Sequence, residues 1–184
     1  RFNIAAKYLN EDRTGGVPGF SDELRGSSEI YGESIYTQRA EVITEYRPAG
    51  LSERLRINTA LTYHAQDSYY GDEAYDATQN IAFGQVTWDQ PLSNRLRILT
   101  GSTLRYESYN DNTPATSDGA DLRFIPGVFT QAELDIADFT LLGGLRIDHH
   151  TEHGFVSAPR LSAKYSPSYS TTLRASGGTG FRVV

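Results

Sequence analysis

Apolar and polar residues alternate along several stretches of the chain. The clearest stretch runs from Leu55 to His64, where the odd positions are mostly apolar and the even positions mostly polar. The same period of two returns at 95–107, 139–148 and 160–165. Because successive side chains of a β-strand point to opposite faces, each stretch predicts a strand with one apolar and one polar face.

Weaker alternation fills the intervals, and apolar residues nowhere keep a helical spacing over three turns. In one of these intervals the faces cannot be assigned, because Ile81 and Phe83 lie on the opposite parity from Val86 and Trp88. The pattern therefore predicts an all-β chain of about nine antiparallel strands connected up and down. The five weaker strands are expected at 2–9, 36–46, 79–88, 125–136 and 171–182.

The predicted connections alternate between long and short. Alternation of this kind is typical of outer-membrane β-barrels, whose periplasmic turns are short and whose external loops are longer. The short turns are expected at 48–50, 91–94, 137–138 and 166–168. Longer polar connections are expected at 10–34, 67–78, 110–124 and 150–155.

The aromatic residues favour the same transmembrane barrel. A mean hydropathy of −0.47 is compatible with it, because alternating strands average out as hydrophilic. Aromatic residues near both ends of the strands predict two girdles at the membrane boundaries, although a soluble β-protein with an aromatic core is the alternative. They are Tyr46, Trp88, Phe139 and Tyr165 beside short turns, and Tyr8, Tyr63 and Tyr106 toward the longer connections.

Composition excludes several functions. The net charge of −6 and the pI near 5.2 argue against a nucleic-acid partner, which usually requires a basic face. Without cysteine there is no disulfide framework and no thiolate metal site. No nucleophile elbow, phosphate loop or zinc-protease motif occurs, so we expect no enzymatic activity and no cofactor.

The chain is expected to be a part of a larger barrel. It contains no methionine and no signal-peptide pattern, and it stops at Phe181–Val184 without a turn residue. A sheet of nine strands that did not close would also leave unpaired backbone groups in lipid, which is very costly. We therefore interpret residues 1–184 as one incomplete barrel domain.

Residues 159–182 resemble the mid-barrel signature of TonB-dependent receptors. The resemblance lies in Pro-Arg-Leu-Ser-Ala-Lys-Tyr-Ser-Pro at 159–167 and in Thr-Leu-Arg-Ala-Ser-Gly-Gly-Thr-Gly-Phe-Arg at 172–182. The ending at 178–184 is similar to the version found in Bacteroidetes members. The stretches 31–36, 113–116 and 123–129 also look like that branch.

The resemblance implies an outer-membrane receptor that imports a scarce nutrient, such as a metal chelate (a siderophore complex), cobalamin or a glycan. It implies a barrel of about 22 strands around a plug, driven by the TonB complex through that plug. Neither the plug nor the remaining strands are in this sequence. Outer-membrane lipid and lipopolysaccharide are the other expected partners. A passive porin or structural barrel, or a soluble β-rich ligand-binding domain, stays open as an alternative.

Three groups of residues are candidates for function. Tyrosines expected in external loops offer flat amphipathic surfaces to a ligand with rings or sugars, or pack the loops together: Tyr69, Tyr70, Tyr75 and Tyr109. Arginines on the polar faces are expected to line the lumen and contact the plug: Arg56, Arg97, Arg105, Arg146, Arg160 and Arg174. His150 and His153, with Asp148 or Glu152, have the donor types of a transition-metal site, although a plain polar external loop is the simpler interpretation.

Overall fold

A computed structural model describes residues 1–51 and 54–181 of the chain. Nine strands form one sheet in chain order, and each pairs antiparallel with the next, as the alternation predicts. Two single 3₁₀ turns, η1 (Asp22–Leu24) and η2 (Pro114–Thr116), lie in the connections. The strands are β1 (Phe2–Gly16), β2 (Gly32–Tyr46), β3 (Leu55–Tyr70), β4 (Glu73–Pro91), β5 (Leu96–Asp111), β6 (Asp121–Ile136), β7 (Phe139–His150), β8 (Gly154–Ser168) and β9 (Thr171–Gly178).

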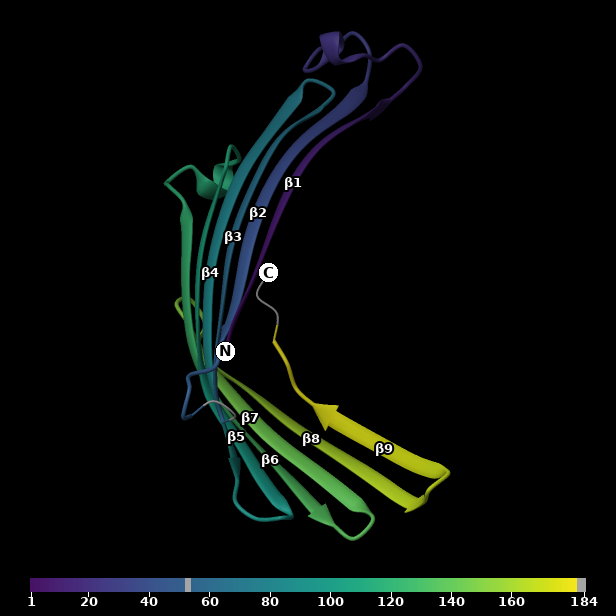
Figure 1. Cartoon of the computed structure of the whole chain (residues 1–184). Helices are drawn as coiled ribbons and strands as arrows, with labels where there is room; N and C mark the ends of the chain where they lie inside the picture. The colour runs from purple at the N-terminus through teal and green to yellow at the C-terminus, as the bar shows by residue number, and fades with distance from the viewer. Residues whose placement is uncertain (52–53, 182–184) are drawn as a thin grey trace.

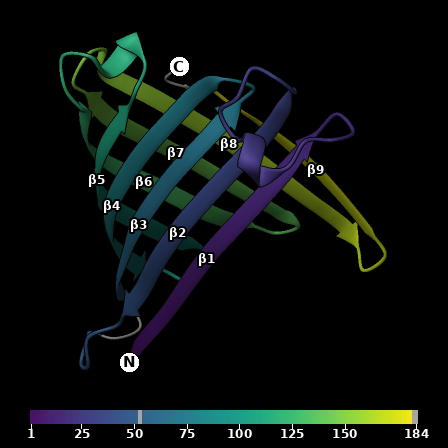
Figure 2. The ribbon, with the colours of Figure 1, turned by 90° about the horizontal axis from the view of Figure 1, so that it is seen from above.

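The sheet is strongly curved and twisted. Figure 1 shows β1–β4 rising along one arm and β6–β9 running along the other. Seen from above, β8 and β9 pass behind β1 and β2 (Figure 2). Among the described residues, β1 and β9 are the edges of the sheet and do not pair with each other. The described part of the chain contains no helix long and apolar enough to cross a membrane.

The strand register divides the side chains between two faces. Residues paired directly across antiparallel strands share a face, so the pairs Leu61–Ala82, Ala82–Tyr106 and Tyr106–Phe124 define one continuous surface. We call this the outer face. The other, the inner face, carries all six arginines expected on the polar side: Arg56, Arg97, Arg105, Arg146, Arg160 and Arg174.

The outer face carries an uncharged belt. Its large apolar side chains are open to the surroundings, as Leu61 (56% exposed) and Leu145 (42% exposed) illustrate. Within the described residues, no outward position of the belt holds a charged side chain, so the belt suits contact with an apolar medium. These positions are the even ones in 2–8, 40–46, 82–88, 96–106 and 124–136, and the odd ones in 55–63, 139–147, 155–165 and 173–177.

Aromatic residues close the belt at both ends. At the end with the shorter turns, Phe139 stacks on Tyr165 with ring centroids 4.3 Å apart, and Phe2 contacts Tyr46 edge-on at 6.5 Å. Trp88 lies on the same face, so the ambiguous stretch 79–88 places Val86 and Trp88 outward and Ile81 and Phe83 inward. Tyr8, Tyr63, Tyr106 and Phe124 form the other end of the belt, and we refer to the belt and its aromatic ends as the membrane-spanning part.

The strands are longer than predicted at the loop end. A β-strand needs about 9–11 residues to cross a bilayer, whereas β4 has 19. The expected long loop at 67–78 is wrong, because β3 and β4 continue to the two-residue turn Gly71–Asp72, where Gly71 has a positive φ of 67°. Above the belt both faces are polar, so the alternation that marks a strand disappears while the backbone ladder continues.

Other connections change for the same reason. The expected loop at 10–34 shrinks to 17–31, and the loop at 110–124 shrinks to 112–120. The short turn expected at 48–50 falls in the longer interval between the end of β2 at Tyr46 and the start of β3 at Leu55, of which residues 52–53 lie outside the described residues. The turn expected at 166–168 lies instead at 169–170, because β8 continues to Ser168 through an irregularity after Tyr165. The last strand, expected over 171–182, ends at Gly178, and residue 182 lies outside the described residues.

Candidate functional site

Two tyrosines meet on the inner face above the membrane-spanning part. Tyr75 comes from β4 and Tyr109 from β5, and their hydroxyl oxygens lie 2.6 Å apart. The Tyr109 hydroxyl also donates a hydrogen bond to Asp111 Oδ2 at 3.0 Å. The hydrogen bond with Tyr75, followed by partial burial and the Asp111 carboxylate, raises the pKa of Tyr109 above its ordinary value. The Tyr75 and Tyr109 hydroxyls therefore offer polar edges at this end of the inner face.

Asp111 links the Tyr75–Tyr109 pair to the connection between β5 and β6 through hydrogen bonds. Its Oδ1 accepts hydrogen bonds from the Thr113 hydroxyl at 2.8 Å, the Thr113 amide at 3.0 Å and the Thr116 hydroxyl at 2.7 Å. The Thr116 hydroxyl contributes most, and together these bonds lower the pKa of Asp111 to about 2. The carboxylate therefore fixes the β5–β6 connection against the tyrosine pair.

The four candidate tyrosines do not form one group. All of them lie on strands and not in loops, which corrects the sequence prediction. Tyr70, Tyr75 and Tyr109 share the inner face, whereas Tyr69 lies on the outer face. Parity along the strand decides this, because Tyr69 and Tyr70 are successive residues of β3 and must point to opposite sides.

Tyr69 serves the β1–β2 connection. The Arg25 guanidinium lies 4.5 Å from the centre of the Tyr69 ring and 4.4 Å from that of the Tyr36 ring, a cation–π arrangement on both. Arg25 Nε donates to the Ser34 hydroxyl at 2.7 Å, and Arg25 also forms an ion pair with Asp67. The connection 17–31 is thus held onto the outer face, above the membrane-spanning part.

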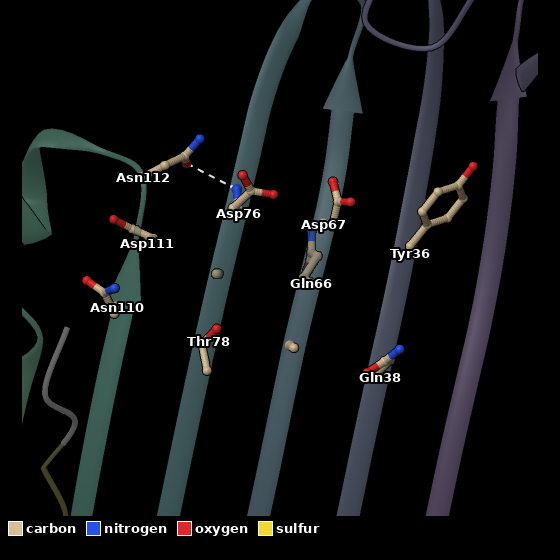
Figure 3. A pocket seen from close by; sticks show the side chains of 11 residues that line it. Tyr36, Gln38, Gln66, Asp67, Asp76, Thr78, Asn110, Asp111 and Asn112 are labelled. Carbon is tan, nitrogen blue, oxygen red and sulfur yellow. Dashed lines mark hydrogen bonds between the residues drawn. The ribbon is translucent and has the colours of Figure 1, made fainter. Parts of the chain in front are cut away.

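A hollow of about 470 Å³ lies on the outer face, and its lining includes Tyr36 and Asp67, which also contact Arg25. Figure 3 shows Tyr36, Asp67 and Asp76 side by side on neighbouring strands. Asn112 reaches over from the β5–β6 connection, and its side-chain oxygen accepts a hydrogen bond from the Asp76 amide at 3.1 Å. None of the four candidate tyrosines lines this hollow. It is a separate feature from the tyrosine pair on the inner face.

The inner face carries ion pairs between residues two apart on one strand. Arg105 pairs with Glu107 at 2.9 Å, Arg123 with Asp121 at 2.7 Å, and Arg146 with Asp148 at 2.6 Å. Asp148 is 2% exposed, and Arg146 binds both of its carboxylate oxygens. Arg123 was not among the sequence candidates, because the strand that carries it was expected to start only at residue 125.

These three arginines line one groove of about 400 Å³ on the inner face, together with Glu107, Asp148 and His150. Ile125 and Phe181 add apolar surface to it. The remaining arginine candidates lie elsewhere on this face, and Arg56 and Arg97 are toward the end with the shorter turns. The structure thus gathers Arg105 and Arg146 into one site and separates them from Arg56, Arg97, Arg160 and Arg174.

The histidine candidates also come together. His150, Glu152 and His153 each offer one possible metal-ligating atom, and these three atoms lie within 4.8 Å of one another. The His150 and His153 rings stack with centroids 4.8 Å apart. Asp148 is not in this group, because it is engaged by Arg146. His150 is fully buried, and its Nδ1 accepts a hydrogen bond from the Glu152 amide at 3.2 Å. A metal at this group stays a prediction.

Comparisons with known proteins agree with this architecture. The sequence model of the family described as "TonB dependent receptor-like, beta-barrel" matches residues 4–183. No curated protein sequence matches the chain. Two solved structures share the fold at 16% identity. The siderophore receptor PirA from Pseudomonas aeruginosa has a TM-score of 0.62 over 79% of this chain and 26% of its own. The FrpB iron transporter from Neisseria meningitidis (F3-3 variant) has a TM-score of 0.67 over 96% and 33%. The chain spans about a quarter to a third of their length.

Proposed function

Because this chain belongs to the TonB-dependent receptor β-barrel family, we propose that it forms part of the wall of an outer-membrane receptor for TonB-driven uptake of a scarce nutrient. The observation that carries the proposal is the separation of the two faces. The uncharged belt suits lipid, and the inner face offers ion pairs and hydroxyl groups to a water-filled or plugged lumen.

The proposed ligand-contacting residues are the inward tyrosines Tyr70, Tyr75 and Tyr109. Phenol side chains combine an apolar ring with a hydrogen-bonding hydroxyl, which suits a ligand that carries rings or several oxygen atoms. A metal chelate, cobalamin and a glycan all have such surfaces. The two structural neighbours are a siderophore receptor and an iron transporter, which favours a metal chelate among the three.

Tyr69 points outward and is therefore not part of the proposed ligand site. Its ring faces Arg25 on the opposite side of the sheet, so its proposed task is to hold the connection 17–31.

Lipopolysaccharide is the proposed neighbour of that connection, because the connection lies on the outer face just beyond the belt. The plug is the proposed partner of the inner arginines nearest the shorter turns, Arg56 and Arg97.

Membrane extraction tests the barrel itself. The receptor is expected to stay in the membrane pellet after carbonate and high-salt washes and to dissolve only in detergent. Release by carbonate alone would favour the soluble β-domain instead. Nutrient-dependent growth with and without TonB then distinguishes active uptake from a passive porin, since passive entry does not need TonB.

A pair of variants on one strand tests the ligand site. Tyr109→Phe removes the inward hydroxyl of β5, whereas Tyr106→Phe removes an outward hydroxyl three residues away and serves as the control. We expect Tyr109→Phe and Tyr75→Phe to weaken ligand binding by roughly three- to tenfold each, the value of one neutral hydrogen bond. Equal effects of Tyr109→Phe and Tyr106→Phe would remove the inward tyrosines from the ligand site.

A further inference from the structure

The last two strands carry positive charge and no acidic residue. All 23 aspartates and glutamates of the chain lie before residue 154, whereas β8 and β9 contain Arg160, Lys164 and Arg174. By register these three side chains lie on the inner face. The inner face is therefore cationic over β8 and β9, although the whole chain has a net charge of −6.

The inward arginines of the preceding strands are paired, which sets β8 and β9 apart. On β3 to β7, each inward arginine has a carboxylate oxygen within 3.5 Å of its guanidinium. These arginines are Arg56, Arg97, Arg105, Arg123 and Arg146. In the described part of the chain, by contrast, Arg160, Lys164 and Arg174 take part in no ion pair.

Two of these unpaired cations lie side by side at one hollow. Lys164 and Arg174 are directly paired on β8 and β9, and both are exposed, so a solute can reach them. Both line a hollow of about 320 Å³. Like charges at directly paired positions destabilise a sheet. An anion between the two side chains would remove this repulsion.

Hydroxyl groups surround the two cations. Ser162 and Ser176 are directly paired at the next inward position of the same strands, and Thr140 lies opposite Lys164 on β7. All three hydroxyl residues line the hollow. Among the residues described, none that lines it is acidic. The hollow therefore offers hydrogen-bond donors next to its positive charge.

Two aspartates lie near this hollow without pairing with its cations. By register Asp135 lies beyond Thr140, and Asp138 precedes β7 in the adjoining turn. The Thr140 hydroxyl donates to Asp135 Oδ1 at 2.7 Å. Within residues 1–51 and 54–181, neither aspartate forms an ion pair with Lys164 or Arg174. The position between the two cations therefore lacks an anion of this chain.

Reachable cations with hydroxyl donors beside them match an anion rich in oxygen. We propose that this hollow binds a carboxylate-type or phosphate-type oxyanion between Lys164 and Arg174, with Ser162 and Ser176 as further donors. The inference rests on the proposed function in one respect, that this face borders the lumen and not lipid. A soluble oxyanion and a carboxylate from another segment of the same receptor have the same chemistry.

Titration with inorganic phosphate tests the site on the purified, detergent-solubilised receptor at constant ionic strength. We expect phosphate to bind, and Arg174→Gln and Lys164→Gln each to weaken its binding by roughly three- to tenfold, between the values of an exposed ion pair and a charged hydrogen bond. Arg174→Lys keeps the charge and should retain most of the binding. Arg13→Gln is the matched control, because Arg13 is also exposed and inward but lies on β1, outside the hollow.

The melting temperature without phosphate separates the two sources of the anion. If the site is empty until phosphate is added, Arg174→Gln removes only the repulsion from Lys164 and should raise the melting temperature. Phosphate binding that Arg174→Gln weakens and Arg13→Gln leaves unchanged then supports a soluble oxyanion. If phosphate does not bind and Arg174→Gln lowers the melting temperature more than Arg13→Gln does, a carboxylate of the receptor itself occupies the site.

Two results would overturn the site. One is phosphate binding that Arg174→Gln and Arg13→Gln affect equally, since this would reflect general attraction to the protein. The other is the absence of phosphate binding without a specific loss of stability in Arg174→Gln. The titration needs neither TonB nor uptake. A receptor that binds phosphate but takes up no nutrient would therefore refute the proposed function and leave the site in place.

Discussion

Asp67 and Asp76 lie directly opposite each other on β3 and β4, and only Asp67 has an ion-pair partner, Arg25, among the described residues. Like charges at directly paired positions of a sheet destabilise it. We expect Asp76→Asn to stabilise the receptor by about 0.2–1 kcal/mol, measured as a raised melting temperature in detergent. Asp72→Asn, in the adjoining turn, is the control. An unchanged or lowered melting temperature for Asp76→Asn would contradict this expectation.

Arg25 is expected to hold the connection 17–31. Arg25→Gln removes the ion pair with Asp67 and both cation–π contacts, so the connection should be cut faster by protease. Each cation–π contact contributes about 0.5–1 kcal/mol at an exposed site, which predicts at least a several-fold faster cleavage between residues 17 and 31. Arg13→Gln, on β1, is the control. Cleavage at the wild-type rate would show that other contacts hold the connection.

Two glycines on neighbouring strands, Gly127 on the inner face and Gly143 on the outer face, test how tightly the inner face is packed at Gly127. A Cβ at Gly127 would lie 2.0 Å from Asp148 Oδ1 and 2.8 Å from Thr103 Oγ1, whereas a Cβ at Gly143 would have nothing within 4 Å. We expect Gly127→Ala to displace the Arg146–Asp148 pair and to cost about 1–3 kcal/mol of folding free energy. Gly143→Ala should be neutral or slightly stabilising. Equal melting temperatures for the two variants would contradict the tight fit at Gly127.

Acid should release the β5–β6 connection. Hydrogen bonds from Thr116 and Thr113 lower the pKa of Asp111 to about 2 from an ordinary value of 3.8. A depressed folded-state pKa means that this stabilisation is complete above about pH 4 and is lost as the pH falls toward 2. Amide exchange over residues 112–120, corrected for its intrinsic pH dependence, should rise across that range. In Asp111→Asn the rise should disappear. A rise that persists in Asp111→Asn would assign the acid response to another group.

Zinc distinguishes two interpretations of the histidine group. His150 Nδ1 already accepts a hydrogen bond from the Glu152 amide, so this nitrogen can ligate an ion together with His153 only if that hydrogen bond breaks. We therefore expect stoichiometric zinc to leave the melting temperature unchanged. A zinc-dependent increase that His153→Ala abolishes would contradict this expectation and establish the metal site.

The belt was predictable because one face of its strands is apolar and the other is polar. The alternation of Leu61 and Tyr63 with Thr62 and His64 records that contrast directly, and so do the aromatic residues at the ends of the belt. The strand ends beyond the belt were not predictable. There, polar residues such as Asp67 and Asp76 occupy the outer face as well, and water on both sides removes the period-two signal.

The absence of alternation beyond the belt also limited the prediction of the candidate site. Placing residues 67–78 in a loop gave Tyr69, Tyr70 and Tyr75 equal access to a ligand, whereas a strand fixes their directions by parity. Arg123 was overlooked because its strand starts at Asp121, in a segment that reads as loop. Arg123 and His150 line the same groove because β6 pairs with β7. That pairing cannot be inferred from either segment of the sequence alone.

The simple order of the strands also bears on how the protein assembles. Among residues 1–51 and 54–181, each strand pairs only with its neighbours in the chain, so every pairing closes a short loop and has a small entropic cost. Hairpins can therefore form one after another, and a growing sheet needs no distant segment before the next strand is added. At each stage the next strand of the chain pairs with the newest one, while β1 stays at the opposite edge, which gives the assembly a direction along the chain.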